Sequence, residues 1–211
     1  MNKHIVAIVL CFIAFKNASA QTEKGSQNLG ASFGISTTTY TTEGYDSKTK
    51  GTSYNISPNY SYFIADKLDI GTSLGFNRVV STVKNSNPTN IKQINRELSA
   101  SVFLRKYFLY NNKIGIRTGP YFTYTHNKSG TTNADAIYNS NYKSNYYRGG
   151  VNLDFVYYPT TNIGLAAGIA DISYIHEKAE ASNSLGAANS NTFNLRFMDN
   201  LSLSIFYVFG K

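Results

Sequence analysis

Four charged residues have types and positions that could do chemistry. Asp69 and Asp154 carry carboxylates, Arg105 and Arg117 carry guanidinium groups, and each stands in a segment where apolar residues alternate with small or polar ones. A charge is tolerated away from water only when it is paired and hydrogen-bonded. If these segments turn their polar faces inward, we expect the four side chains to form an interior salt-bridge network. Such a network fills the interior; its alternative role is a gate or a substrate contact.

A second group is purely cationic. Arg78 and Arg96 share the phase of the apolar positions, and Lys84 and Lys92 lie in the polar segment between them. Guanidinium forks and ammonium groups both bind phosphate. These four residues are therefore predicted contacts for phosphate groups, which would be those of lipopolysaccharide if the chain lies in an outer membrane, and the alternative is ordinary solvated charge.

Catalytic chemistry has weak support in the sequence. His126 with Ser129, and His176 with Glu177, are candidate catalytic pairs. Neither pair has a third catalytic residue at a recognisable sequence spacing. No cluster of Cys and His ligands, phosphate loop or dinucleotide motif is present. We therefore expect no enzyme, metal or cofactor, and a lipid-A-modifying enzyme is the least favoured function.

The elements that must position these residues show a period of two, which is typical of strands with two different faces. In the first, Leu29, Ala31, Phe33 and Ile35 alternate with glycine and serine. The predicted strands are Asn28 to Thr42, Ser53 to Ile64, Leu68 to Thr82, Asn95 to Phe108, Ile114 to His126, Asn145 to Tyr158, Ile163 to His176 and Thr192 to Gly210.

The connections between these eight segments alternate in length. Three are short and resemble one another, in YFIADKLDIG, YFLYNNKIGI and YYPTTNIGLAAG. Four are long and polar: Glu43 to Thr52, Val83 to Ile94, Asn127 to Ser144 and Glu177 to Asn191. Short turns on one side and long loops on the other are the pattern of an all-β, eight-stranded, antiparallel, up-and-down transmembrane β-barrel. A soluble β-sandwich or lipocalin-like barrel would instead turn its apolar face inward, and it leaves the alternating connection lengths unexplained.

Aromatic residues gather where the strands meet the short turns and at the end of the last strand. Aromatic rings prefer the interface between a membrane and water. We therefore expect these residues to form a ring of aromatic side chains, the inner girdle, at the periplasmic interface. They are Tyr62, Phe63, Tyr107, Phe108, Tyr157, Tyr158, Tyr207 and Phe209.

Several positions disturb the pattern. Pro58 and Pro120 fall inside predicted strands, where each predicts a bulge or a position without a ladder hydrogen bond. Asp199 and Asn200 predict either a bulge or a further turn that would give ten strands, and the phase also slips near Asp171.

The first 20 residues read as a secretory signal peptide, with a lysine, an apolar stretch and a small-residue end, cleaved between Ala20 and Gln21. Residues 21–211 are then one barrel domain. Its formal charge is +6, because the leader removes Lys3 and Lys16 from a total of +8. The positive charge is dispersed and the chain is exported, so nucleic acid is not an expected partner.

The segments SPNYSYFIADKLDIGTSLGF and LSLSIFYVFGK resemble those of the small outer-membrane β-barrels of Gram-negative bacteria, the OmpA- and OmpX-type barrels. The resemblance covers the whole mature chain and implies location in the cell outer membrane. It also implies that the barrel-insertion machinery reads the last strand, although here Phe209 is followed by Gly210 and Lys211.

An eight-stranded barrel is only wide enough for side chains to fill, so a general, porin-like diffusion pore is disfavoured. We expect a monomer in contact with outer-membrane lipid and lipopolysaccharide, with a filled interior and a structural, surface-display or adhesive role. The segment from Asn133 to Gly149 is the expected contact with an extracellular ligand. The alternative is a narrow channel or a lateral transporter of small solutes.

Overall fold

The computed structural model describes residues 22–42, 47–84, 91–133, 140–181, 187–198 and 203–210. The predicted leader, the cleavage point between Ala20 and Gln21, and the pair Asp199 and Asn200 lie outside these residues. In the described part of the chain, no helix is long and apolar enough to cross a membrane.

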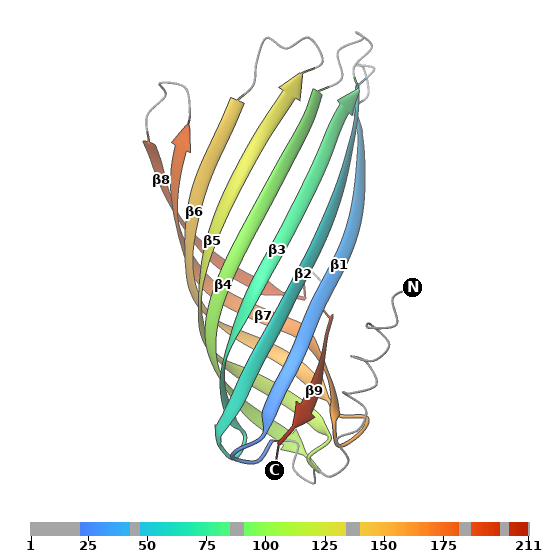
Figure 1. Cartoon of the computed structure of the whole chain (residues 1–211), viewed down its shortest axis with the longest axis vertical. Coiled ribbons are helices and arrows are strands. Elements are labelled where there is room, and N and C mark those ends of the chain that lie inside the picture. The colour runs from blue at the N-terminus through green and yellow to red at the C-terminus, as the bar shows by residue number, and fades with distance from the viewer. Residues whose placement is uncertain are drawn as a thin grey trace, which may run out of the picture.

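The described residues form a single antiparallel sheet. Its strands are β1 (Gln27–Thr42), β2 (Ser47–Ala65), β3 (Leu68–Lys84), β4 (Ile91–Tyr110), β5 (Ile114–Asn133), β6 (Ser140–Tyr157), β7 (Ile163–Ala181), β8 (Ala187–Phe197) and β9 (Leu203–Phe209). Each of β1 to β7 pairs with the next along the chain, and β9 closes the ring between β7 and β1 (Figure 1). The predicted ring of eight strands is confirmed.

The strands are longer than predicted and the polar connections correspondingly shorter. β4 and β5 have 20 residues each, and β2 already begins at Ser47, inside the predicted first loop. The extra length comes from mostly polar residues that include several threonines, such as residues 47–52 in β2 and 127–133 in β5. Threonine is favoured in strands, and a ladder of backbone hydrogen bonds does not require apolar side chains. The apolar pattern therefore marked only the part of each strand that faces lipid.

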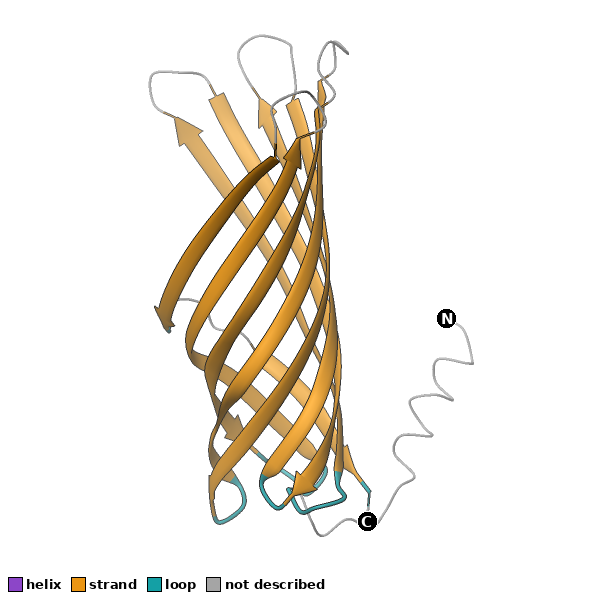
Figure 2. Ribbon diagram, turned by 90° about the vertical axis from the view of Figure 1, so that its left-hand side faces the viewer, coloured by secondary structure: helices purple, strands orange, loops and turns teal. Residues whose placement is uncertain are grey.

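The last predicted strand is divided into two. β9 pairs with Ile163–Ala167 of β7, and β8 pairs with the part of β7 above it, from Ala170 upward. Opposite β6, Asp154 pairs with Gly168 and Leu153 with Ala170, so Ile169 is an extra, bulged residue. The phase slip expected near Asp171 is this bulge. Figure 2 shows the break at the left, where one strand ends partway down the barrel wall.

The division leaves a seam in the upper half of the wall. Among the described strands, β8 pairs only with β7, and β1 pairs with β9 only as far as Ser32. Figure 1 shows β1 and β8 at opposite sides of the view at their upper ends. Continued upward past the bulge, the register would place Ile35 opposite Phe197, and both side chains face outward. The seam is therefore a stretch in which the edges of β1 and β8 are not paired with each other, although both edges turn their apolar side chains outward.

The outer face is apolar and the inner face is polar. Phe33 and Ile35 are 75% and 74% exposed on the outside, whereas Ser61 and Asp69 are fully buried inside. This orientation is that of a barrel that spans a membrane, and it excludes the soluble alternative.

Some of the aromatic residues expected in the inner girdle point inward instead. Tyr62 and Tyr157 face outward, but Phe63, Tyr107 and Tyr158 are buried in the interior. The reason is the strand period itself, because neighbouring residues must face opposite sides. Of each adjacent aromatic pair, only one member can therefore belong to the girdle.

The three repeated motifs are the short turns, with two, three and five residues between strands. Lys67, Asn111 and Asn112 adopt positive φ angles of 60°, 47° and 54° there. The segment Thr22–Ser26 crosses the same end of the barrel, where the Lys67 backbone N–H donates to the Thr22 carbonyl at 2.7 Å.

Both prolines occupy positions without a ladder bond. Next to Pro58 the β2–β3 pairing omits two residue pairs, and next to Pro120 the β4–β5 pairing does the same, each without a change of register. The bond-free prediction is confirmed, and neither proline makes a bulge.

The closed and open parts of the wall can be told apart by cysteine crosslinking. Ser32 and Ser204 are strand partners, so the double variant Ser32→Cys with Ser204→Cys should form a disulfide on mild oxidation of the folded barrel. The pair Ile35→Cys with Phe197→Cys lies across the seam and should stay reduced.

Non-reducing gel mobility and intact mass give the readout, and the predicted mature chain has no other cysteine. Efficient crosslinking of the second pair would show that the seam is closed.

Candidate functional site in the barrel interior

The four charges predicted to lie inside are brought together near the short-turn end. Asp69 and Arg105 are direct strand partners on β3 and β4, as are Arg117 and Asp154 on β5 and β6. Arg105 binds Asp69 through two nitrogens, with Nη2 2.6 Å from Oδ2 and Nε 3.0 Å from Oδ1. Arg117 Nε lies 2.8 Å from Asp154 Oδ2. The result is two buried ion pairs of opposite orientation around the ring.

Tyr107 joins the two pairs. Its hydroxyl donates to Asp69 Oδ2 at 3.0 Å and accepts from Arg117 Nη1 at 3.5 Å. Ser61 Oγ adds a 2.6 Å hydrogen bond to Asp69. We call this set, with Asp69, Arg105, Arg117 and Asp154, the inner plug. Its satisfied hydrogen bonds are what allow these charges to be buried.

An aromatic floor lies beneath the inner plug. Phe63 packs against Tyr107 with ring centres 5.4 Å apart, and Tyr158 packs edge to face against Phe206 at 5.6 Å. The Arg117 guanidinium sits 5.4 Å from the centre of the Phe206 ring. Tyr158 follows β6 in the third short turn, and burial raises the pKa of its hydroxyl well above the ordinary value. The floor therefore stays uncharged and closes this end of the barrel.

A second charge cluster, which the sequence reasoning missed, lies higher in the interior. Asp171 on β7 binds both Arg148 on β6 and Arg196 on β8. The Tyr121 hydroxyl donates to Asp171 Oδ2 at 2.6 Å and the Ser173 hydroxyl to Oδ1 at 2.9 Å. We call these five residues the upper cluster. Arg148 could have been found from its phase on β6, but the Ile169 bulge hid the inward direction of Asp171.

A chamber of about 450 Å³ separates the inner plug from the upper cluster. The guanidinium groups of both clusters line it, together with many small polar side chains. The expectation of an interior filled throughout is therefore wrong. The reason is side-chain size, because serines such as Ser57, Ser73 and Ser101 occupy the inward positions at this height. Ser32, Arg196 and Ser204 place the base of the seam in the chamber wall.

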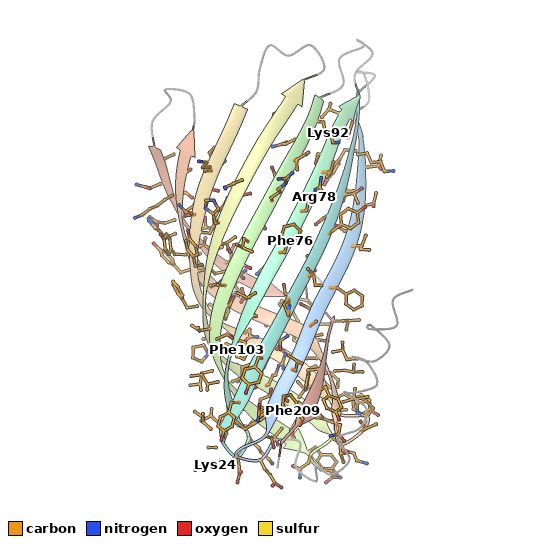
Figure 3. All side chains as sticks on the ribbon, viewed as in Figure 1. Lys24, Phe76, Arg78, Lys92, Phe103 and Phe209 are labelled. Atoms are coloured by element: carbon orange, nitrogen blue, oxygen red, sulfur yellow. The ribbon has the colours of Figure 1, made fainter. Side chains whose placement is uncertain are left out.

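Three of the predicted phosphate contacts lie on the outer face, away from the chamber. Arg78 and Arg96 are strand partners and both are exposed, and Lys92 is exposed further up β4. Figure 3 shows Phe76, Arg78 and Lys92 in ascending order along the upper half of the barrel. Lys84 ends β3, and its side chain lies outside the described part of the structure.

The two histidines considered for catalysis each contact an asparagine. His126 Nδ1 lies 2.8 Å from Asn145 Oδ1, and His176 Nδ1 lies 2.8 Å from Asn191 Oδ1. Ser129 instead accepts a hydrogen bond from Gln93 at 3.4 Å. Among the described residues, no three His, Cys, Asp or Glu side chains are grouped so as to hold a metal ion.

Comparison with known proteins gives structural likenesses only. No family model matches the sequence, and no curated protein is similar enough to be a relative. The outer membrane protein OprG from Pseudomonas aeruginosa is 12% identical, with 92% of this chain and 100% of that chain covered and a TM-score of 0.47. A major outer membrane protein from Thermus thermophilus is 14% identical over 89% and 100%, with a TM-score of 0.45. Ail, the attachment invasion locus protein of Yersinia pestis, is 13% identical over 88% and 99%, with a TM-score of 0.42.

The inner plug predicts a strongly non-additive pair of substitutions. Arg105→Ala alone leaves Asp69 buried without its main partner and should lower the free energy of unfolding by about 3–5 kcal/mol. The double variant Asp69→Leu with Arg105→Met removes both charges and should lose much less. Urea unfolding of the barrel in lipid vesicles measures both.

A matched control is Lys113→Ala, which removes an exposed cation from the second short turn and should change stability little. Equal losses in the single and double variants would contradict a plug held by charge pairing.

Proposed function

We propose that the chain is an outer-membrane barrel whose role is exercised at its outer rim, as a structural or adhesive surface protein. The observation that carries this proposal is strand length. β2 to β7 have 17 to 20 residues, whereas about 9–11 residues cross the hydrocarbon core. The remaining residues of each strand then lie outside the hydrocarbon core. They form a rigid, polar rim of paired strands that an extracellular ligand can contact.

The closed inner end supports the same proposal. The aromatic floor and the inner plug leave no room for general diffusion through the barrel, because their side chains are buried across its short-turn end. We propose a monomer that the barrel-insertion machinery places in the outer membrane after removal of the leader, with both chain ends on the periplasmic side. Outer-membrane lipid and lipopolysaccharide surround it, and an extracellular ligand would meet the rim.

The expected ligand contact, Asn133 to Gly149, takes a specific form in this proposal. Asn133 ends β5, residues 140–149 belong to β6, and residues 134–139 lie outside the described structure. The contact surface is therefore built on a strand pair rather than on a long free loop. We also propose that the barrel is not an enzyme, since His126 and His176 are each engaged by an asparagine.

Shortening one hairpin tests the rim. Ser129 pairs with Tyr142, so replacing residues 129–142 by an Asn-Gly turn would remove the top of β5 and β6 and keep the register below it. The shortened barrel should still fold, as shown by its shifted gel mobility before boiling. Cells that express it should aggregate and settle more slowly than cells that express the full barrel.

A matched control substitutes three rim threonines of β1, Thr37, Thr38 and Thr39, by serine, which keeps the rim polar and should not change settling. A steady single-channel current through the reconstituted full-length barrel would contradict the proposal, because it requires an open path through the floor.

A second candidate function is lateral transport of small solutes through the barrel wall. The chamber and the seam together favour it. The chamber is polar and closed below, and its wall includes residues from both edges of the seam. Solutes could therefore pass between the chamber and the outer half of the bilayer without crossing the floor.

Labelling of single cysteines tests this second function. Ser101→Cys lines the chamber on the wall formed by β4, whereas Ser61→Cys is fully buried in the inner plug. A maleimide dissolved in the bilayer should label the first variant readily and the second at least ten times more slowly. Equal labelling rates for the two variants, or no labelling of the chamber position, would rule out lateral transport as a function.

A further inference from the structure

A line of four cations crosses the outer face of the barrel. Arg78 on β3 is the strand partner of Arg96 on β4, Arg96 is the partner of Lys128 on β5, and Lys128 is the partner of Lys143 on β6. Strand partners point to the same face, with Cβ atoms about 4.5–5.5 Å apart. All four side chains are exposed. We call them the cationic row; its next neighbours are Tyr54 on β2 and Glu180 on β7.

At one end the cationic row meets a protein carboxylate, because Glu180 is the strand partner of Lys143, but the Glu180 side chain lies outside the described part of the structure. Arg78, Arg96 and Lys128 have only one another, Lys143 and Tyr54 as strand partners. The four ion pairs among the described side chains all lie in the interior and include no member of the row. Glu97, the chain neighbour of Arg96, turns inward and accepts a hydrogen bond from Asn77 at 3.1 Å. Like charges directly opposite one another destabilise a sheet. Three such contacts in succession therefore favour an external anion that is shared along the row.

The cationic row borders the apolar face. One step nearer the short turns on the same face lie Phe76 and Leu98, which are partners and are 45% and 61% exposed. Tyr124 and Tyr147 lie nearby and pack in a tilted arrangement with ring centres 5.4 Å apart, and tyrosine is favoured at a membrane interface. Barrel strands tilt by roughly 35–45°, so the row climbs across the sheet and spans the depth of a headgroup layer.

We propose that the cationic row is a binding site for phosphate groups of anionic lipids in the outer leaflet, with a headgroup that carries two phosphates as the best match. Three intervals of about 5 Å give the row a length of about 15 Å, enough for two separated phosphates. The arginines bind phosphate oxygens as forks and the lysines as point charges. The inference rests on the proposed membrane location.

This site differs from the phosphate contacts predicted from the sequence. Arg78 and Arg96 belong to both sets, but Lys128 and Lys143 are 32 and 47 residues beyond Arg96 in the chain and join the row only through strand register. Lys92 is the partner of Thr82 and therefore lies four residue pairs above the row. A lipid held by four strands would also tie their outer halves together.

Neutralising the centre of the row tests the proposal. The double variant Arg96→Gln with Lys128→Gln and the wild-type barrel would be folded in micelles and titrated with diphosphorylated lipid A, with bound lipid counted by native mass spectrometry. We expect the apparent Kd of the variant to rise at least tenfold. The matched control Lys24→Gln with Lys113→Gln removes two exposed cations from the short-turn end and should change it less than twofold.

Two further measurements keep the result interpretable. Arg96→Lys retains the charge and should bind within about threefold of the wild type. For the wild type alone, raising the salt from 0.1 M to 1 M should weaken binding strongly, because exposed charges are screened. This readout does not depend on the variants folding.

Unchanged binding by the neutral double variant, or insensitivity of wild-type binding to salt, would overturn the lipid site. So would equal occupation of the row by inorganic phosphate, which would identify a free anion as the ligand. In these cases normal insertion into vesicles, seen as a shifted gel mobility before boiling, leaves the proposed membrane location standing. Failure of the wild-type barrel to insert at all would instead remove the location.

Discussion

The structure depends on one constraint, which is that backbone groups in hydrocarbon must find hydrogen-bond partners within the protein. β9 meets this constraint in the lower half of the wall, because it pairs with β7 on one side and with β1 on the other. Asn162 secures it further by donating a 3.0 Å side-chain hydrogen bond to the Val208 carbonyl. A strand of only seven residues thus turns a sheet into a ring.

Closure of the lower ring explains where the charges are buried. Side chains that point inward there have no access to water, so Asp69 and Asp154 are held by arginines on neighbouring strands. Higher up, the inward positions carry small residues and the wall is interrupted, and a polar chamber takes the place of a packed interior. The burial of the ion pairs follows the completeness of the backbone ring, because Asp69 and Arg105 are more deeply buried than Asp171 and Arg196.

The break between β8 and β9 links features that look unrelated in the chain. It accompanies the Ile169 bulge, whose carbonyl accepts a hydrogen bond from the Met198 backbone N–H at 2.8 Å. It also leaves the upper edge of β1 without a partner among the described strands and brings Arg196 to Asp171 in the chamber wall. One local irregularity therefore shapes the chamber, the upper cluster and the seam.

The sequence by itself determined the eight-membered ring, the short turns and the inward direction of Asp69, Arg105, Arg117 and Asp154, because alternation and turn residues are local signals. It did not determine strand ends, because the polar parts of the strands carry no apolar pattern. Only the tertiary structure decided which distant residues are neighbours, such as Asp171 with Arg196, or Lys128 with Arg96. Those contacts depend on register between strands, and a single bulged residue changes which face every later side chain presents.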